Sequence, residues 1–382
     1  MHDGNLVRAA SLFSGVGGLE LQGSSEILCE LDSDCRVVLK RRFRDSYVHD
    51  DVSTLKAVPG IDVVFGGWPC QDISVAGLRR GVAGARSGLI FKMIDFAHTS
   101  GAGTIVAENV PNLLSLDRGE NFRLTLDAFH EAGYPFVSWR ILNARQFKLP
   151  HQRRRIFLIA TQEREVATKL LRDVQMHPEA VRENPGVAGF YWTAGLQGIN
   201  FSLGFSPTLK VGSSLSIPSP PAVYYKNVVR PLSPGEALAL QGFPKTPFKG
   251  LSPQVIYRMM GNAVALPVGR FVAKSLTVKR TKMSGQLRPI RMDPTLFGDS
   301  KTPNPWPFAG LKDGADLYEY VDPIDEAPLS TSLDEFIDLE SPDRLSSRAA
   351  TGLLARLDRS GKYCPPKLRT ALSRLSQTHA LP

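Results

Sequence analysis

The chain has 382 residues, 42% of them hydrophobic, which is enough for one large α/β domain and at least one smaller lobe. Its 46 Lys and Arg outnumber 37 Asp and Glu, and the net charge of +9 favours a phosphate-bearing partner. No run long enough to span a bilayer and no signal-peptide pattern occurs, and Cys29, Cys35, Cys70 and Cys364 lack metal-ligand or disulfide-framework spacing. The sequence therefore predicts a protein of the reducing cytoplasm that holds no metal.

The first predicted element is a strand from Val7 to Phe13 that runs into Ser14-Gly15-Val16-Gly17-Gly18, with a helix from Leu19 onward. Glycines at such a turn let a ligand approach the backbone, and a helix amino terminus presents N–H groups to an anion. The spacing differs from the dinucleotide fingerprint, and no Lys-Ser/Thr pair follows as in a phosphate loop. A nucleotide-type site is predicted, with a glycine-rich turn that binds nothing as the alternative.

Acidic residues follow the next two predicted strands. The strand from Glu26 to Cys29 ends in Glu30, and a later strand ends near Asp51. Carboxylates at the tips of neighbouring strands suit a ribose hydroxyl pair and an exocyclic amine, although each alone is typical of a solvated charge. With the glycine-rich turn, they predict an adenosine-containing cofactor.

A candidate nucleophile follows the next apolar run. Residues 61–65 stop at Gly66-Gly67, and Pro69, Cys70 and Gln71 come directly after Trp68. Buried parallel strands deliver catalytic groups to the loops at their carboxyl ends. Cys70 therefore stands where a nucleophile would be used, while a buried structural cysteine is the alternative.

Two further strands carry an acid and a basic cluster. The run 104–107 ends in Glu108-Asn109-Val110, and the run 155–161 follows Arg153-Arg154-Arg155. A carboxyl, a thiol and an arginine at the ends of strands of one sheet could converge on a single planar heterocycle. Read separately, the carboxyl is typical of a strand-end cap and the arginines of a solvated basic face.

In the rest of the chain, the pattern of predicted elements and the charge differ from region to region. Residues 162 to about 229 lose the strand–helix alternation, and residues 313–343 hold eleven acids and no base. Residues 344–382 hold eight bases and one acid, and Leu345, Ala349, Leu353 and Leu357 keep helical spacing before Gly361. Pro365-Pro366 opens a second helix. We expect a loop-rich acidic connector followed by a helical hairpin, which could pack back on the catalytic domain.

Together these segments resemble the DNA (cytosine-5)-methyltransferase family of bacteria and phages. Six stretches are similar to its motifs in the family's order: Phe13 to Gly18, Gly67-Trp68-Pro69-Cys70-Gln71, Glu108-Asn109-Val110, Arg153-Arg154-Arg155, Arg230 to Glu236 continuing to Pro244, and Gly261-Asn262-Ala263-Val264. Three positions depart from the family. His151 stands where its Gln-x-Arg-x-Arg motif has Gln, Leu31 where a tryptophan is common, and Ser11 where an aspartate is often seen.

The resemblance implies a fold and a division of the chain. The fold is the α/β, Rossmann-like sheet of S-adenosyl-L-methionine-dependent methyltransferases with helices on both faces, a small irregular target-recognition lobe and a helical extension. Residues 1–161 would bind cofactor and catalyse, 162–229 would recognise the target, and 230–282 would return to the catalytic domain. Residues 283–343 would be a linker with the acidic segment, and 344–382 the hairpin extension.

The resemblance also implies the site residues. The catalytic set is Cys70, Glu108, Arg153 and Arg155. The set that binds S-adenosyl-L-methionine is Phe13, Ser14, Gly15, Gly17, Gly18, Glu30, Leu31, Asp51, Val52, Pro69, Ile90, Asn262, Ala263 and Val264. The set that binds the substrate is Gln71, Ser74, Asn109, Thr208 and Leu209, the last two in a stretch similar to the family's Thr-Leu element.

The expected activity is site-specific methylation of C5 of a flipped cytosine in double-stranded DNA, through a covalent adduct of Cys70 with C6. Sequence choice is assigned to 162–229 and not to the carboxyl-terminal hairpin. A monomer on DNA, a bacterial or phage origin and a possible cognate restriction endonuclease are expected. The tRNA-methylating branch of the family and a silent DNA-binding homologue are the alternatives, and a DNA-mimicking flap is the alternative for the acidic segment.

Overall fold

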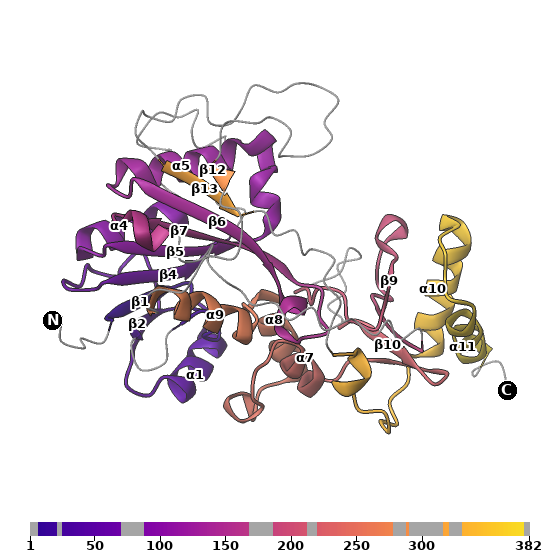
Figure 1. Cartoon of the computed structure of the whole chain (residues 1–382). Coiled ribbons are helices and arrows are strands. Elements are labelled where there is room, and N and C mark those ends of the chain that lie inside the picture. The colour runs from indigo at the N-terminus through magenta and orange to yellow at the C-terminus, as the bar shows by residue number, and fades with distance from the viewer. Residues whose placement is uncertain are drawn as a thin grey trace. The chain divides into compact units, whose positions relative to one another are not determined.

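The computed structural model describes residues 7–20, 25–69, 88–167, 186–211, 220–277, 288–289, 316–320 and 331–377. The chain forms two compact units (Figure 1). The first unit comprises 1–142, 154–175 and 268–323, and the second comprises 143–153, 176–267 and 324–382. None of the described helices combines the length and the apolar content needed to cross a membrane.

A sheet of nine described strands organises the first unit, in the order β12-β13-β6-β7-β5-β4-β1-β2-β3. Its strands are β1 (Ala9–Leu12), β2 (Ser25–Cys29), β3 (Tyr47–His49), β4 (Val63–Gly67), β5 (Thr104–Asn109), β6 (Phe136–Asn143), β7 (Arg154–Thr161), β12 (Arg288–Pro289) and β13 (Asp316–Tyr320). The helices are α1 (Ser33–Arg42), α4 (Leu89–Ser100), α5 (Glu120–Glu131), α6 (Arg164–Ala167) and α9 (Leu266–Thr277), whose first two residues belong to the second unit.

The strand directions explain why the sequence motifs fall at one edge. β1 pairs in parallel with both β2 and β4, and β4 pairs in parallel with β5, so their carboxyl ends share an edge. β7 runs antiparallel to β5, which brings its first residues to that same edge. Each of these strands is short and almost wholly buried, as expected of strands covered on both faces. The predicted α/β sheet is confirmed.

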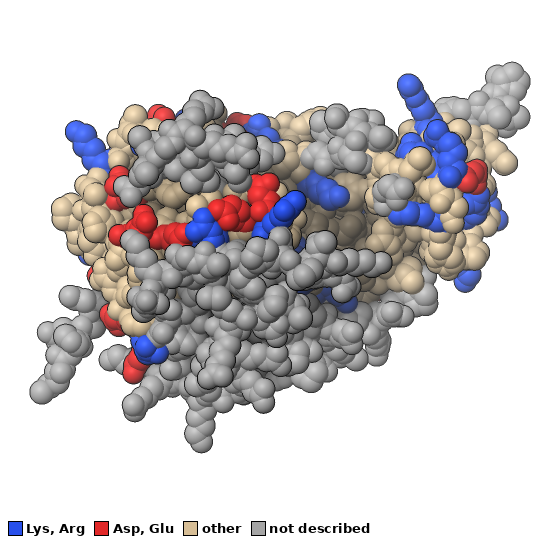
Figure 2. Space-filling view, turned by 90° about the horizontal axis from the view of Figure 1, so that it is seen from above, with Lys and Arg blue, Asp and Glu red and all other residues tan. Residues whose placement is uncertain are grey.

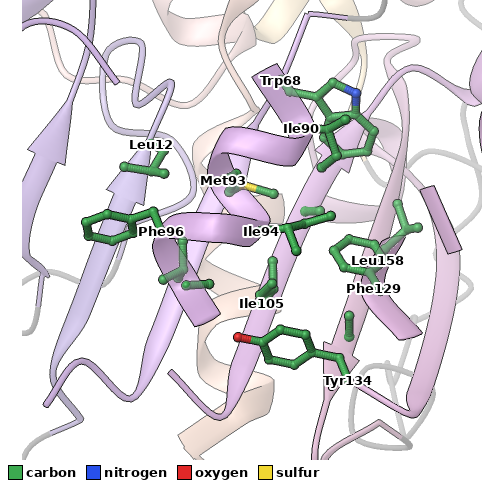
Figure 3. Close-up of a cluster of buried hydrophobic side chains, with 14 of the residues drawn as sticks. Leu12, Trp68, Ile90, Met93, Ile94, Phe96, Ile105, Phe129, Tyr134 and Leu158 are labelled. Atoms are coloured by element: carbon green, nitrogen blue, oxygen red, sulfur yellow. The ribbon is translucent and has the colours of Figure 1, made fainter. Parts of the chain in front are cut away.

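One hydrophobic core fixes this sheet against α4 (Figure 3). Ile90, Met93, Ile94 and Ala97 recur at helical spacing and are buried against β-strand residues such as Ile105. Burying each large aliphatic side chain contributes roughly 1.5–3 kcal/mol. The helix therefore holds β4 and β5 in place, and with them the starting points of the loops that follow these strands.

The second unit contains a four-stranded antiparallel sheet in the order β11-β10-β8-β9. Its elements are β8 (Val187–Phe190), β9 (Phe201–Leu203), β10 (Ala222–Tyr225), β11 (Val228–Pro231), α7 (Pro234–Leu240), α8 (Pro253–Asn262), α10 (Ser347–Ser360) and α11 (Pro366–Gln377). The expectation of an irregular lobe over 162–229 is corrected, because all four strands begin in that interval. They have only three or four residues each, too few for alternation to stand out in the sequence.

The carboxyl-terminal hairpin belongs to this second unit. Leu353 and Leu357 of α10 and Leu368 and Leu372 of α11 share a core with Phe190 and other residues of the β8–β11 sheet. The expected linker is also partly ordered, since β13 pairs in parallel with β6 in the first unit. The sequence did not indicate either contact, because an amphipathic helix or a five-residue strand does not specify its partner.

Candidate active site

The glycine-rich segment leaves β1 through three residues in the left-handed region. Phe13, Gly15 and Gly17 have φ of 57°, 55° and 81°. A Cβ at Gly17 would lie 2.3 Å from the Phe43 ring, whereas a Cβ at Gly15 would meet nothing within 4 Å. Gly17 is thus required by packing and Gly15 leaves open space for a ligand. The expected helix does not begin at Leu19, where the chain bends, and residues 21–24 lie outside the described part.

The carboxylate of Glu30 is tied to this turn. It accepts hydrogen bonds from the amides of Gly15 (2.7 Å) and Asp32 (2.8 Å), and burial raises its pKa. The next side chain, Leu31, is 76% exposed, so its apolar surface is open to a ligand. An acid beside an exposed apolar surface suits a ribose and the face of an adenine ring.

The remaining candidate cofactor-binding residues of the first unit differ in how far their side chains are exposed. Asp51 follows β3 and accepts from the Ser53 amide at 2.8 Å, while Val52 is partly buried against the core. Ile90 is fully buried beside Trp68 (Figure 3), so its side chain contributes to the site through packing. Ser14 is also buried, and its hydroxyl donates to the Ser11 carbonyl at 3.0 Å. The open turn, two carboxylates and exposed Leu31 together fit the adenosine part of S-adenosylmethionine.

The acid and one arginine of the predicted catalytic set meet at the sheet edge. Glu108 near the end of β5 and Arg155 near the start of β7 form an ion pair, with Nε 2.9 Å from Oε1. Their side chains are only 10% and 14% exposed. The antiparallel register of β5 and β7 creates this proximity, which was predicted from the strand ends alone. A charged pair at such low exposure interacts far more strongly than it would in water.

The end of β4 is fitted against this pair. A Cβ at Gly67 would lie 2.7 Å from Oε2 of Glu108, so only glycine leaves the carboxyl in place. The Asn109 side chain donates to the Trp68 carbonyl at 3.0 Å and accepts from the Val110 amide at 2.8 Å. Asn109 therefore positions the chain just before exposed Pro69. Cys70, Gln71 and Ser74 lie outside the described residues.

Arg153 contacts main-chain carbonyls of the second unit. Its guanidinium donates to the carbonyls of Leu209 (3.2 Å) and Gly261 (3.0 Å), and the residue is 2% exposed. The Thr208 hydroxyl donates to the Gln152 carbonyl, and buried Leu209 donates its amide to Nε2 of His151 at 3.0 Å. These contacts hold the Thr-Leu element against the arginine motif.

His151 explains how one departure from the family pattern is accommodated. Its ring is fully buried, and Nε2 must carry a lone pair to accept the Leu209 amide. A glutamine at this position could offer the same acceptor through its side-chain oxygen. The substitution therefore preserves the hydrogen bond that the Thr-Leu element needs.

Two residues that organise this region were not predicted from the sequence. The Tyr191 hydroxyl donates to the Thr208 carbonyl at 3.1 Å and accepts from the Lys210 amide at 2.8 Å, and burial raises its pKa to about 12. Gln241 donates to the Met260 carbonyl at 2.7 Å, next to the Gly261-Asn262-Ala263-Val264 motif. Both lie in segments that the sequence had flagged, but only the tertiary structure shows their partners.

The Gly261-Asn262-Ala263-Val264 motif lies in the second unit. A Cβ at Gly261 would lie 2.6 Å from the amide nitrogen of Val211, so glycine permits a close approach of two backbones. Asn262 is exposed, Ala263 is buried and Val264 is half-buried. We propose, as the sequence predicts, that Asn262, Ala263 and Val264 contact the cofactor.

The family model for C-5 cytosine-specific DNA methylase matches residues 7–187 and 200–278. The chain belongs to this family. It is 31% identical over 380 residues to the Type II methyltransferase M2.BsuMI of Bacillus subtilis (strain 168), covering 92% of this chain and 94% of that protein. It is 27% identical to the Type II methyltransferase M.Bsp6I of a Bacillus species, covering 71% and 98% respectively. The match to M2.BsuMI must extend beyond residue 278, where the family match ends.

A solved structure shares the fold. A DNMT2 variant of Spodoptera frugiperda superposes with a TM-score of 0.50 at 14% identity, covering 71% of this chain and 99% of that one. The family match and the Type II relatives make this protein a DNA (cytosine-5-)-methyltransferase. Members of this family use S-adenosylmethionine as the methyl donor.

Proposed function

We propose that this methyltransferase acts at one specific site in double-stranded DNA and methylates a cytosine that is rotated out of the helix. The observation that supports this proposal most directly is the Glu108–Arg155 ion pair at the sheet edge. The pair packs against the end of β4, which leads into Cys70. Rotating the base out of the stack costs a few kcal/mol, and contacts of basic residues with phosphates offset that cost.

The chemistry begins with a nucleophile because C5 of cytosine is itself unreactive. The thiolate of Cys70 adds to C6, and the ring electrons move so that C5 becomes nucleophilic. A free cysteine titrates near 8.5, so basic surroundings that lower this value would favour the thiolate. After methyl transfer, a water molecule takes the proton from C5 and the C6–S bond breaks, which restores the thiolate. N3 then returns its proton to Glu108.

Glu108 and Arg155 handle the charge that the thiolate delivers to the ring. Adding sulfur at C6 raises electron density on N3 and O2, so Arg155 leaves Glu108 and donates a hydrogen bond at O2. Glu108, protonated once that ion pair is broken, donates its proton at N3. The ion pair between Glu108 and Arg155 supports this proposed change of partner, because it holds both side chains at the same edge of the sheet. S-adenosylmethionine, when bound at the Gly15, Glu30 and Leu31 surface, supplies the electrophilic methyl group.

The β8–β11 lobe is proposed to read the target sequence. Catalytic and cofactor residues serve every site alike, so discrimination must come from side chains that reach base edges. We further propose that the enzyme works as a monomer on DNA and accompanies a cognate restriction endonuclease.

One experiment tests the function directly. The purified protein is incubated with methyl-labelled S-adenosylmethionine and either unmethylated duplex DNA or tRNA, and bisulfite sequencing then locates the modified bases. We expect label in DNA at C5 of cytosines in one sequence context. Label in tRNA alone would assign the protein to the RNA-methylating branch, and label in neither would refute the proposal.

A further inference from the structure

The carboxyl-terminal hairpin, α10 with α11, is an integral part of the second unit. Besides the shared core, the Leu345 amide donates to the Val229 carbonyl of β11 at 2.8 Å. Arg356 and Lys362 donate to the carbonyls of Trp192 and Ile199 near the same sheet. The hairpin is thus held to the β8–β11 sheet by its apolar side and by two of its cations.

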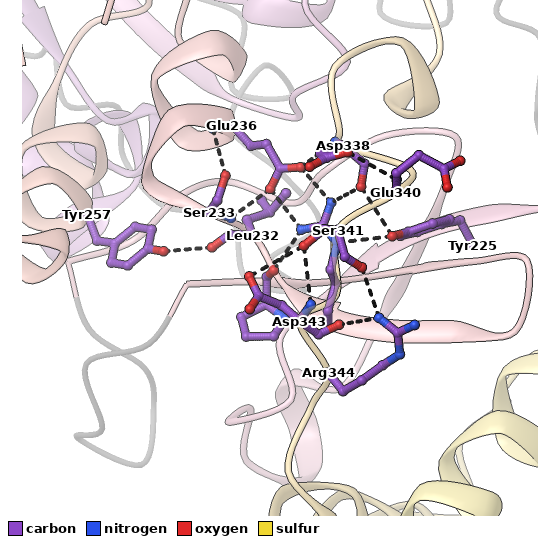
Figure 4. A network of polar contacts seen from close by, with 12 residues as sticks. Tyr225, Leu232, Ser233, Glu236, Tyr257, Asp338, Glu340, Ser341, Asp343 and Arg344 are labelled. Carbon is purple, nitrogen blue, oxygen red and sulfur yellow. Dashed lines mark hydrogen bonds and ion pairs between the residues drawn. The ribbon is translucent and has the colours of Figure 1, made fainter.

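A polar network anchors the chain that leads into the hairpin (Figure 4). Glu236 accepts two hydrogen bonds from Arg230, at 2.6 and 2.9 Å, and one from the Asp338 amide at 2.6 Å. Arg230 also donates to the Asp338 carbonyl at 2.8 Å. All these groups belong to the second unit. The segment before α10 is therefore fixed in position and does not act as a loose tether.

The hairpin's other sides carry positive charge. Residues 344–377 hold eight Lys and Arg and one acid, Asp358, which is itself paired with Arg369. The exposed cations of the two helices other than Arg369 are Arg348, Arg359, Lys367 and Arg374, which we call the hairpin cations. Figure 2 shows Lys and Arg gathered at the right of the view, over the part of the chain that holds α10 and α11.

The spacing of the hairpin cations suits a polyanion. Arg348 and Arg359 are eleven residues apart, which is close to three helical turns, so they lie on one side of α10, opposite its buried leucines, about 16 Å apart. Solubility alone would be served by mixed charges, whereas a surface of one sign attracts phosphates.

We propose that the hairpin cations bind backbone phosphates of duplex DNA that flanks the target site. This inference rests on the proposed action on DNA and adds a phosphate-binding surface outside the family match. Because the hairpin shares its core with the proposed recognition sheet, contacts made by the cations would orient that sheet on the duplex. Phosphate contacts carry no sequence information, so they would raise affinity without changing the site.

The test compares three double variants with the wild type. R348Q/R359Q removes two hairpin cations, R348K/R359K keeps their charge, and K56Q/K92Q removes two exposed lysines of the first unit. Binding to a 40-base-pair duplex is measured by fluorescence anisotropy over a range of salt concentrations. The slope of log K against log salt is negative, and each lost phosphate contact reduces its magnitude by about 0.9. We expect a drop of about 2 for R348Q/R359Q only, with an unchanged methylated sequence.

Several results would overturn the inference. An unchanged slope for R348Q/R359Q would show that the hairpin does not contact DNA, and an equal drop for K56Q/K92Q would show a response to total charge alone. A drop seen with duplex RNA but not with DNA would assign the surface to another partner. If the wild type methylates DNA while any of these results is found, the proposed function stands and only the hairpin inference fails. A wild type that neither binds nor methylates DNA would refute both.

Discussion

At the residue scale, the proposed chemistry depends on a small number of side chains. Cys70→Ser should abolish methyl transfer and leave cofactor binding intact, because a serine hydroxyl is not ionised near neutral pH while the glycine-rich turn is unchanged. The wild type should form an adduct with duplex DNA that carries 5-fluorocytosine, visible on denaturing gels. Equal adduct in Cys70→Ser would remove Cys70 from the mechanism.

Glu108→Gln should lower the single-turnover rate by about a hundredfold to ten-thousandfold, the usual value of general acid catalysis. The amide can still contact Arg155 but has no acidic proton to give, so DNA affinity should change little. The exposed Glu131→Gln on α5 is a suitable control. A Glu108→Gln rate within about threefold of the wild type would reduce Glu108 to a structural partner of Arg155.

Gly67→Ala tests the fit between β4 and the catalytic acid. The new methyl group would lie 2.7 Å from Oε2 of Glu108, so the carboxyl must shift, and turnover should fall at least about tenfold. Gly103→Ala is the matched control, since its Cβ would be no closer than 4.0 Å to the Gln162 side chain. Normal turnover in Gly67→Ala would show that the position of Glu108 tolerates displacement.

At the scale of elements, the hairpin and the β8–β11 sheet form one packing unit. Leu353 is fully buried between them, so Leu353→Ala should lower the free energy of unfolding by about 2–5 kcal/mol in urea titrations. Ala355→Gln, an exposed change on the same helix, should have little effect. By the same reasoning, truncation before residue 344 should destabilise the recognition lobe. A fully stable Leu353→Ala protein would contradict the shared core.

At the scale of the whole molecule, the Arg230–Glu236 pair should make stability depend on pH. Burial alone would raise the pKa of Glu236, but hydrogen bonds from Arg230 and two backbone amides lower it below its usual value of 4.5. The stabilisation is therefore complete above that value and is lost as pH falls through the lower, folded pKa. Glu236→Gln should cost about 3–5 kcal/mol at neutral pH.

The difference between Glu236→Gln and the wild type should shrink as pH is lowered from about 5 toward 3. Chemical unfolding of both proteins across this range measures it. The comparison is needed because burial raises the pKa of Glu20 and Glu30, whose contributions have the opposite sign and cancel in the difference. A difference that is constant with pH would show that Glu236 is not ionised in the folded protein.

The sequence by itself determined the family, the α/β class and the order of the motifs, because each motif is local and each buried strand reads as an apolar run. It also placed Glu108 and Arg155 at strand ends. The pairing of the strands then brings Nε of Arg155 within 2.9 Å of Oε1 of Glu108. Only the tertiary structure decided that Arg153 serves main-chain carbonyls, that Asn109 fixes Trp68, and that the hairpin packs on the β8–β11 sheet. Those choices depend on partners far away in the chain, and neither the spacing of apolar residues nor the presence of a motif specifies them.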